Sequence, residues 1–119
     1  MDVGSRLGPV LWMGYLFSHA KKLIGIELNK TFANLAQQIV DTNKFGERIS
    51  IVNDNALNQG DILKDADVVV LNNVFEWFSD QQELRNLWEF VSKAISKKGA
   101  IVVTCPSIEE SLEHAGVRI

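Results

Sequence analysis

The chain has 119 residues, of which 46% are hydrophobic and 23% are charged, a composition that suits one globular domain in water. The net charge of -3 provides no broad basic surface, so we expect no nucleic-acid partner. The longest strongly apolar stretch, residues 9–17, is too short to cross a bilayer, so we also expect no membrane partner.

The chain has a single cysteine, Cys105, which cannot form an intrachain disulfide. This favours a reducing compartment, the cytoplasm or the nucleus. Because Cys105 ends an apolar run, we expect its thiol to be buried. There is no cluster of Cys and His residues, so the sequence predicts no metal site.

In the first half of the chain, β-rich runs alternate with segments of helical period. A glycine-containing turn precedes Pro9, which is suited to the first position of a helix that we expect to run to residue 20. Residues 23–28 and 49–52 read as strands, and Asn29 is a suitable N-cap for the helix between them. The helical spacing predicts one buried face for that helix, made by Phe32, Leu35, Ala36, Ile39 and Val40.

The alternation continues in the second half. Residues 53–65 are polar and predict no more than a short helix, whereas residues 67–71 form an apolar run typical of a strand covered on both faces. Ser79 starts a pattern with capping-box spacing, followed by a buried stripe of Leu84, Leu87, Trp88, Val91 and Ile95. Residues 100–105 form the last clear strand, and Ser107 with Glu110 predicts a capping box for a short helix.

Strands that alternate with helices indicate parallel βαβ units with right-handed crossovers, and therefore an α/β fold. We expect a single domain over residues 1–119 that is truncated at both ends and lacks the last strands. Only Met1 precedes Asp2 where a first strand of about five residues is expected, and residues 116–119 resemble the start of another strand.

The residues that could bind a ligand follow the strands, since ligands of open parallel sheets bind at the carboxyl ends of the strands. The first such segment is Asp2-Val-Gly-Ser-Arg-Leu-Gly8, whose small residues let backbone amides approach a ligand at a helix N-terminus. Glu27 follows the second strand, 23 positions after Gly4, about where a carboxylate would bind the hydroxyls of a ribose. Glu27 could also be an ordinary carboxylate at a strand end, but the order of the motifs favours the ribose contact.

Together these segments resemble the class I S-adenosylmethionine-dependent methyltransferases. The resemblance starts with Asp-x-Gly-x-x-x-Gly at residues 2–8 and a strand that ends in Gly-Ile-Glu27. It continues through residues 53–56, residues 71–78 and the glycine and strand of residues 98–103, and so covers nearly the whole chain. The family implies a Rossmann-like fold, with a doubly wound, mostly parallel sheet and helices on both faces.

The resemblance also implies S-adenosyl-L-methionine as the cofactor and a methyl acceptor as the second substrate. Asn72 and Asn73 would face the transfer site as the catalytic pair, although they could merely satisfy backbone groups at a strand end. Asp54 would orient the adenine, or it could be a turn former. The expected cofactor-binding residues are Asp2, Gly4, Ser5, Gly8, Glu27, Leu28, Asp54, Asn55 and Asn72.

The nature of the methyl acceptor stays open between a protein side chain and a small molecule. The Asn-Asn-x-Phe segment that starts at Asn72 is also similar to a segment of the non-SET histone-lysine methyltransferases. A catalytically degenerate binding module is the alternative function.

Arg6 stands where the family usually has glycine. Either its side chain must point out of the loop, or its backbone must avoid a positive φ. A dinucleotide-binding site fits less well, because Arg6 and Pro9 occupy two of the glycine positions of Gly-x-Gly-x-x-Gly. A P-loop is excluded, because the chain has no Gly-Lys-Ser or Gly-Lys-Thr triplet.

Overall fold

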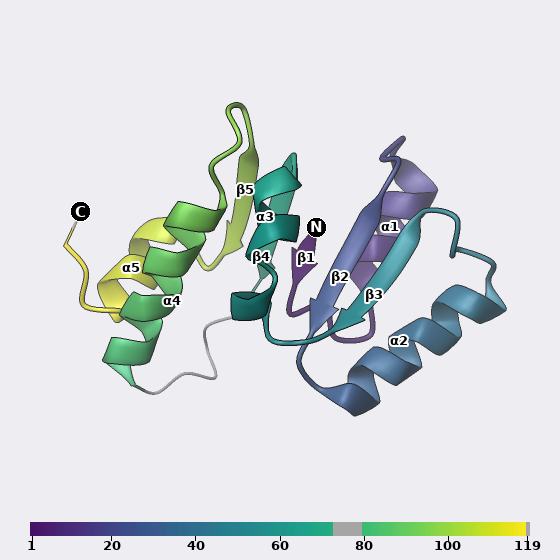
Figure 1. Ribbon diagram of the computed structural model, residues 1–119, viewed down its shortest axis with the longest axis horizontal. Helices are drawn as coiled ribbons and strands as arrows, with labels where there is room; N and C mark the ends of the chain where they lie inside the picture. The colour runs from purple at the N-terminus through teal and green to yellow at the C-terminus, as the bar shows by residue number, and fades with distance from the viewer. Residues whose placement is uncertain (73–79, 119) are drawn as a thin grey trace. The chain divides into compact units, whose positions relative to one another are not determined.

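The computed structural model describes residues 1–72 and 80–118. The chain forms two compact units, Met1–Gln59 and Gly60–Ile119. Each unit is an arrangement of parallel strands and helices, as Figure 1 shows. Within the described ranges, no helix is long and apolar enough to span a membrane.

Unit 1 contains three parallel strands in the order β3-β2-β1. These strands are β1 (Asp2–Val3), β2 (Leu23–Glu27) and β3 (Ile49–Asn53). All five residues of β2 are in register with β3, whereas β1 pairs with β2 over two residues. The loops after these three strands contain most of the predicted cofactor residues.

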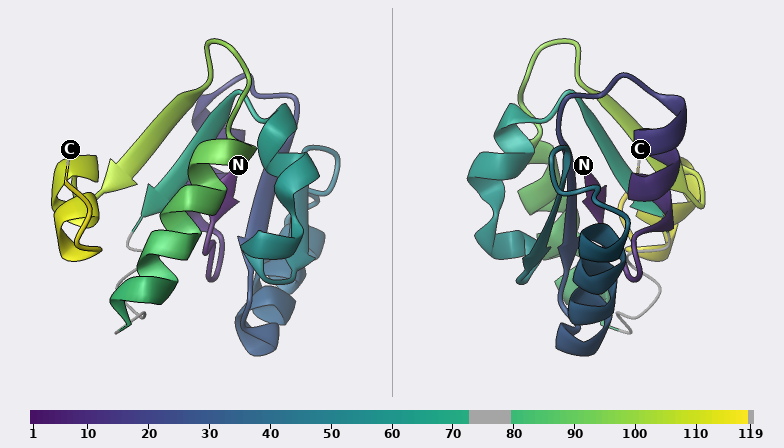
Figure 2. Two further views of the ribbon diagram at one scale, coloured as in Figure 1. Left: turned by 60° about the vertical axis from the view of Figure 1, so that its left-hand side comes forward. Right: turned by 90° about the vertical axis from the view of Figure 1, so that its right-hand side faces the viewer.

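Two helices cover one face of the unit 1 strands, α1 (Pro9–Phe17) and α2 (Lys30–Thr42). Leu11 of α1, Val40 of α2 and Ile49 of β3 belong to one buried cluster. Figure 2 shows both helices on the same side of β2 and β3. This arrangement follows from two right-handed crossovers that step in the same direction along a sheet.

The predicted buried face of α2 is partly wrong. The residues that α2 buries are Ala33, Ala36 and Val40, whereas Phe32 and Leu35 are 41% and 42% exposed. Small side chains at helical spacing let α2 lie close to the strands, and this close packing leaves the two larger side chains at the margin. The predicted N-cap is confirmed, because the Asn29 side chain accepts a hydrogen bond from the Phe32 N–H.

The described residues of unit 2 form two parallel strands, β4 (Val68–Asn72) and β5 (Ile101–Cys105). Three helices accompany them: α3 (Gly60–Asp65), α4 (Gln81–Ala94) and α5 (Ile108–His114). Leu84, Leu87, Trp88 and Val91 are buried as predicted. The capping box of α5 is also confirmed, with Ser107 and Glu110 bonded reciprocally.

Three predictions for unit 2 are wrong. The N-cap of α4 is Asp80, whose side chain accepts from the Gln82 N–H, and Ser79 lies outside the described residues. In β4, burial alternates, because Val69 is buried while Val68 is 41% exposed. Cys105 at the end of β5 is exposed rather than buried, since the described helices of unit 2 do not cover this strand.

Candidate cofactor site

The turn after β1 is fixed to β2 by backbone hydrogen bonds. The N–H groups of Gly4 and Ser5 both donate to the Ile26 carbonyl, at 2.8 and 3.1 Å. The Gly8 N–H donates to the Ser5 carbonyl at 2.8 Å and closes the turn in front of α1. Gly4 and Gly8 have φ values of 72° and 90°, a region that glycine adopts without steric cost.

Arg6 lies in the same turn with a φ of 50°. The backbone of Arg6 therefore has the left-handed conformation that would suit the glycine usual at this position in the class I methyltransferases. The Arg6 side chain is exposed, which corresponds to one of the two outcomes that the sequence allowed. The amide N–H of Arg6 is directed into the protein and donates to Glu27 Oε1 at 2.8 Å.

Glu27 joins two loops through its carboxylate. Oε1 accepts from the Arg6 N–H, and Oε2 accepts from the Asn29 N–H at 2.8 Å. The residue is 7% exposed, so these bonds fix the carboxylate at the carboxyl end of β2. A carboxylate offers about four lone-pair positions, and two of them accept these backbone N–H groups.

Asp2 is a second buried carboxyl group, only 4% exposed, at the start of the turn. Burial raises the pKa of Asp2 from 3.8 to about 6; the positive N-terminus opposes this rise, and the negative charge of Glu27 adds to it. Ser5 is 2% exposed, and its hydroxyl has no hydrogen-bond partner among the described residues. The turn and the two strands beside it thus contain three buried polar residues, Asp2, Ser5 and Glu27.

Asn53, at the end of β3, was not predicted as a site residue. Its side-chain amide donates to the carbonyls of Glu27 and Leu28, at 2.9 and 3.1 Å. This contact fixes the loop after β2, where Leu28 is 66% exposed. Its place at the strand end, in the segment 53–56 of the resemblance, was the sequence signal for it, but turn formers often occupy such positions.

Asp54 and Asn55 form a tight polar loop. The Asp54 carboxylate accepts from the Asn55 N–H and from the side-chain amides of Asn58 and Gln59, at 2.7 to 3.0 Å. These hydrogen bonds lower the pKa of Asp54. The Asn55 side chain accepts from the Leu57 N–H and caps the short 3-10 helix Ala56–Asn58. Both side chains therefore have a role in the loop itself, whatever they contact in a complex.

The predicted catalytic pair belongs to unit 2. Asn72 is the last residue of β4, and its side chain is exposed. Asn73 lies outside the described residues. The structure thus brings Asp2, Gly4, Ser5, Gly8 and Glu27 together in unit 1, and places Leu28, Asp54 and Asn55 in the loops that follow β2 and β3.

Comparison with known proteins assigns the class. Residues 1–103 match the family described as "Methyltransferase domain", and the chain belongs to that family. The resemblance to class I S-adenosylmethionine-dependent methyltransferases is thereby confirmed, and with it the Rossmann-like α/β class.

The similar proteins are distant in sequence. The chain is 22% identical over 113 residues to a probable cobalt-precorrin-6B C(15)-methyltransferase (decarboxylating) of Methanobrevibacter smithii, a match that covers 95% of the chain and 56% of the relative. An O-methyltransferase from Bacillus cereus, solved in complex with SAH, has a similar fold with a TM-score of 0.62 at 14% identity, over 97% of this chain and 57% of that one. The pyocyanin biosynthetic protein PhzM has a similar fold with a TM-score of 0.56 at 13% identity, over 96% of this chain and 42% of that one. The chain thus spans about half the length of these proteins.

Proposed function

We propose that this chain binds S-adenosylmethionine through unit 1 and that the protein transfers the methyl group to an acceptor. The observation that carries the proposal is the buried Glu27 carboxylate, which two backbone amides hold at the carboxyl end of β2. Its two remaining lone-pair positions suit a pair of donors such as the 2′ and 3′ hydroxyls of a ribose. The family match and the SAH complex of a protein with this fold support the choice of cofactor.

The methionine part of the cofactor suits the turn between Gly4 and Gly8. This turn leads into the N-terminus of α1, where the positive end of the helix dipole favours a carboxylate. The buried Asp2 carboxyl lies at the start of the turn and is suited to a cationic ammonium group. The N-terminus of α1 thus suits the carboxylate of the methionine part, and Asp2 suits its ammonium group.

The adenine part is assigned to the loops after β2 and β3. Leu28 offers an exposed apolar side chain for the ring, and Asp54 and Asn55 offer polar groups. Because the Asp54 carboxylate already accepts from three groups, we expect it to act mainly by holding the shape of its loop.

Catalysis in this class needs little covalent participation by protein groups, since a sulfonium methyl is already activated. The task of the protein is to align the acceptor with the methyl group and to exclude water. We assign Asn72 and Asn73 to the transfer side, where an amide can hydrogen-bond an amine or a hydroxyl. The acceptor is either a small molecule, as the name of the precorrin methyltransferase suggests, or a protein side chain.

Titration calorimetry of the chain with S-adenosylmethionine, S-adenosylhomocysteine and NAD tests the proposal. We expect both sulfur ligands to bind, and Glu27→Gln to weaken binding about tenfold or more, because a charge-assisted hydrogen bond contributes roughly 1.5–3 kcal/mol. The control is Glu47→Gln, at an exposed position, which should leave affinity unchanged. Absence of heat with both sulfur ligands would refute the proposal, and tight binding of NAD would indicate an oxidoreductase. If S-adenosylmethionine binds but the full-length protein methylates neither small molecules nor proteins, the degenerate binding module is the better description.

A further inference from the structure

We propose that Gly25, in the middle of β2, is a positioning residue for the ligand turn of residues 4–8. The inference rests on the proposed function, since it concerns how the same site is held. The bare Cα of Gly25 provides the space in which the Ser5 side chain lies, and so sets where the turn lies over the strand.

The space above Gly25 is too small for any side chain. A Cβ atom added there would lie 2.6 Å from Leu11 Cδ1, 2.7 Å from Ser5 Oγ and 2.9 Å from Ser5 Cβ. Real Cβ atoms essentially never approach other heavy atoms below 3.0 Å. The Leu11 methyl group is the tip of a flexible side chain and can rotate, but Ser5 Cβ is attached directly to the turn. An added methyl group at Gly25 must therefore move the turn.

The backbone conformation gives no other reason for a glycine at this position. Gly25 is paired with Asp2 of β1 and with Ile51 of β3, so it lies in the interior of the parallel strands. Glycine weakens a strand at such a position, and it commonly marks a close approach of another segment. Here the approaching segment is the turn itself.

The contacts of the turn follow β2 residue by residue. The Ser5 side chain lies over Gly25, the Ser5 N–H donates to Ile26, and the Arg6 N–H donates to Glu27. Raising Ser5 from the strand would therefore lengthen the bond between Arg6 and Glu27. The Glu27 carboxylate would lose one of the two donors that hold it for a ligand. Gly25 thus acts on the proposed ribose site through Ser5.

The test compares Gly25→Ala, Ser5→Gly and the double variant Gly25→Ala/Ser5→Gly, in which both Ser5 atoms that clash are removed. Gly46→Ala is the matched control, because a Cβ there meets only Val40 Cγ1, at 4.0 Å. Three quantities are measured for each variant: the Kd for S-adenosylhomocysteine, the hydrogen-exchange rates of the Gly4, Ser5 and Arg6 amides, and circular dichroism as a check of folding.

We expect Gly25→Ala to raise the Kd about tenfold, as for loss of one hydrogen bond to a charged group, and to speed amide exchange in the turn. The double variant should restore the Kd to that of Ser5→Gly alone, and the control should match the wild type. A rescue of this kind would not occur if Gly25 served only the stability of β2. Wild-type affinity in Gly25→Ala, or a double variant that binds more weakly than Ser5→Gly alone, would overturn the inference.

Two further outcomes are decisive. If Gly25→Ala does not fold, a double variant that folds and binds like Ser5→Gly supports the inference, and one that fails to fold or binds more weakly than Ser5→Gly overturns it. If the wild type binds no S-adenosylhomocysteine, the proposed function fails by itself. In that case exchange rates decide the positioning role, and unchanged rates in Gly25→Ala would contradict it.

Discussion

The left-handed backbone of Arg6 is the most unusual local feature of the candidate site. With a φ of 50°, Arg6 adopts a conformation that costs a residue with a Cβ roughly 1–2 kcal/mol. Its contact with Glu27 uses only the backbone N–H, which every residue except proline has. The left-handed backbone at this position, which glycine adopts without steric cost, is therefore what directs the N–H to Glu27.

Replacing Arg6 with glycine should increase stability without changing ligand affinity. Relief of strain outweighs the greater entropy of the unfolded chain, so we expect Arg6→Gly to raise the free energy of unfolding by about 0.5–1 kcal/mol, measured with urea. Lys44, whose φ is 57°, provides a matched control, since Lys44→Gly should have a similar effect far from the turn. A tenfold change in the Kd for S-adenosylhomocysteine in Arg6→Gly alone would show that the guanidinium acts on the ligand.

The buried Asp2 carboxyl should make stability depend on pH. Its pKa is raised from 3.8 to about 6, so the folded state binds the proton more tightly than the unfolded state does. The contribution of Asp2 is therefore most favourable below pH 3.8 and is lost as the pH rises to about 6. Asp2→Asn should consequently gain stability over the wild type across this window, by about 2 kcal/mol at neutral pH. Urea unfolding at several pH values measures the difference, and a constant difference would contradict the assigned pKa.

At the scale of elements, Arg48 ties the end of α1 to the start of β3. Its guanidinium donates to the carbonyls of Tyr15, Ser18 and Ala20, at 3.0, 2.9 and 2.8 Å. It also lies over the Tyr15 ring, 4.5 Å from the centroid. The last carbonyls of a helix lack intrahelical donors, and one planar cation here supplies three donors.

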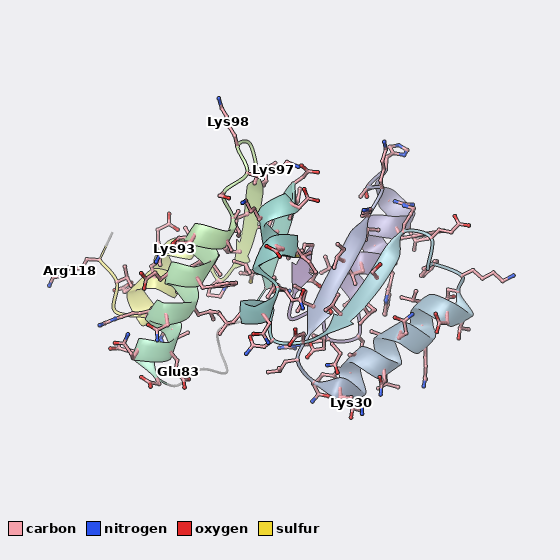
Figure 3. The ribbon with its side chains drawn as sticks, in the orientation of Figure 1. Lys30, Glu83, Lys93, Lys97, Lys98 and Arg118 are labelled. Carbon is pink, nitrogen blue, oxygen red and sulfur yellow. The ribbon has the colours of Figure 1, made fainter. Side chains whose placement is uncertain are left out.

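A lysine cannot replace these contacts, because an ammonium group is a compact charge without the planar fork of donors. We expect Arg48→Lys to lower the free energy of unfolding by about 2 kcal/mol, and Arg48→Ala by about 3 kcal/mol. Arg118→Lys is the control, since Figure 3 shows the Arg118 side chain extending away from the ribbon, and it should change stability by less than about 0.5 kcal/mol. Equal stability of Arg48→Lys and the wild type would show that the three hydrogen bonds contribute little.

Local signals in the sequence predicted most of the elements. Asn29 and the pair Ser107 and Glu110 were identified as caps because capping depends on residues three positions apart. The face of α2 was partly mispredicted, since Phe32 has the right spacing and hydrophobicity but lies beside the packed stripe. Which of two adjacent stripes a helix buries depends on the strands beneath it, and helical spacing does not contain that information.

At the scale of the molecule, β5 presents an exposed apolar surface on which other chains can pair. Ile101 and Val103 are 58% and 49% exposed, on the strand that ends the strand order. Exposed apolar strands at the end of a sheet pair readily with other chains.

The prediction of one domain over residues 1–119 stays a prediction.

We expect this chain to self-associate at high concentration, and Ile101→Lys/Val103→Lys to reduce that association. Both positions are exposed, so each change should alter the free energy of unfolding by less than about 0.5 kcal/mol. Sedimentation equilibrium measures the association, and Lys30→Glu, at an exposed position of α2, is a control for a change of charge alone. Association that the double lysine variant leaves unchanged would exclude β5 as the contact surface.

The sequence by itself determined the alternation of elements, the order of the motifs and therefore the methyltransferase class, because these depend on spacing along the chain. Tertiary structure alone decided how the site is held. The two donors on Glu27 come from residues 21 positions before it and 2 after it. The burial that raises the pKa of Asp2 and the close contact of Ser5 with Gly25 exist only once β1 is paired with β2. Contacts between distant segments depend on how the strands align, and no local pattern specifies them.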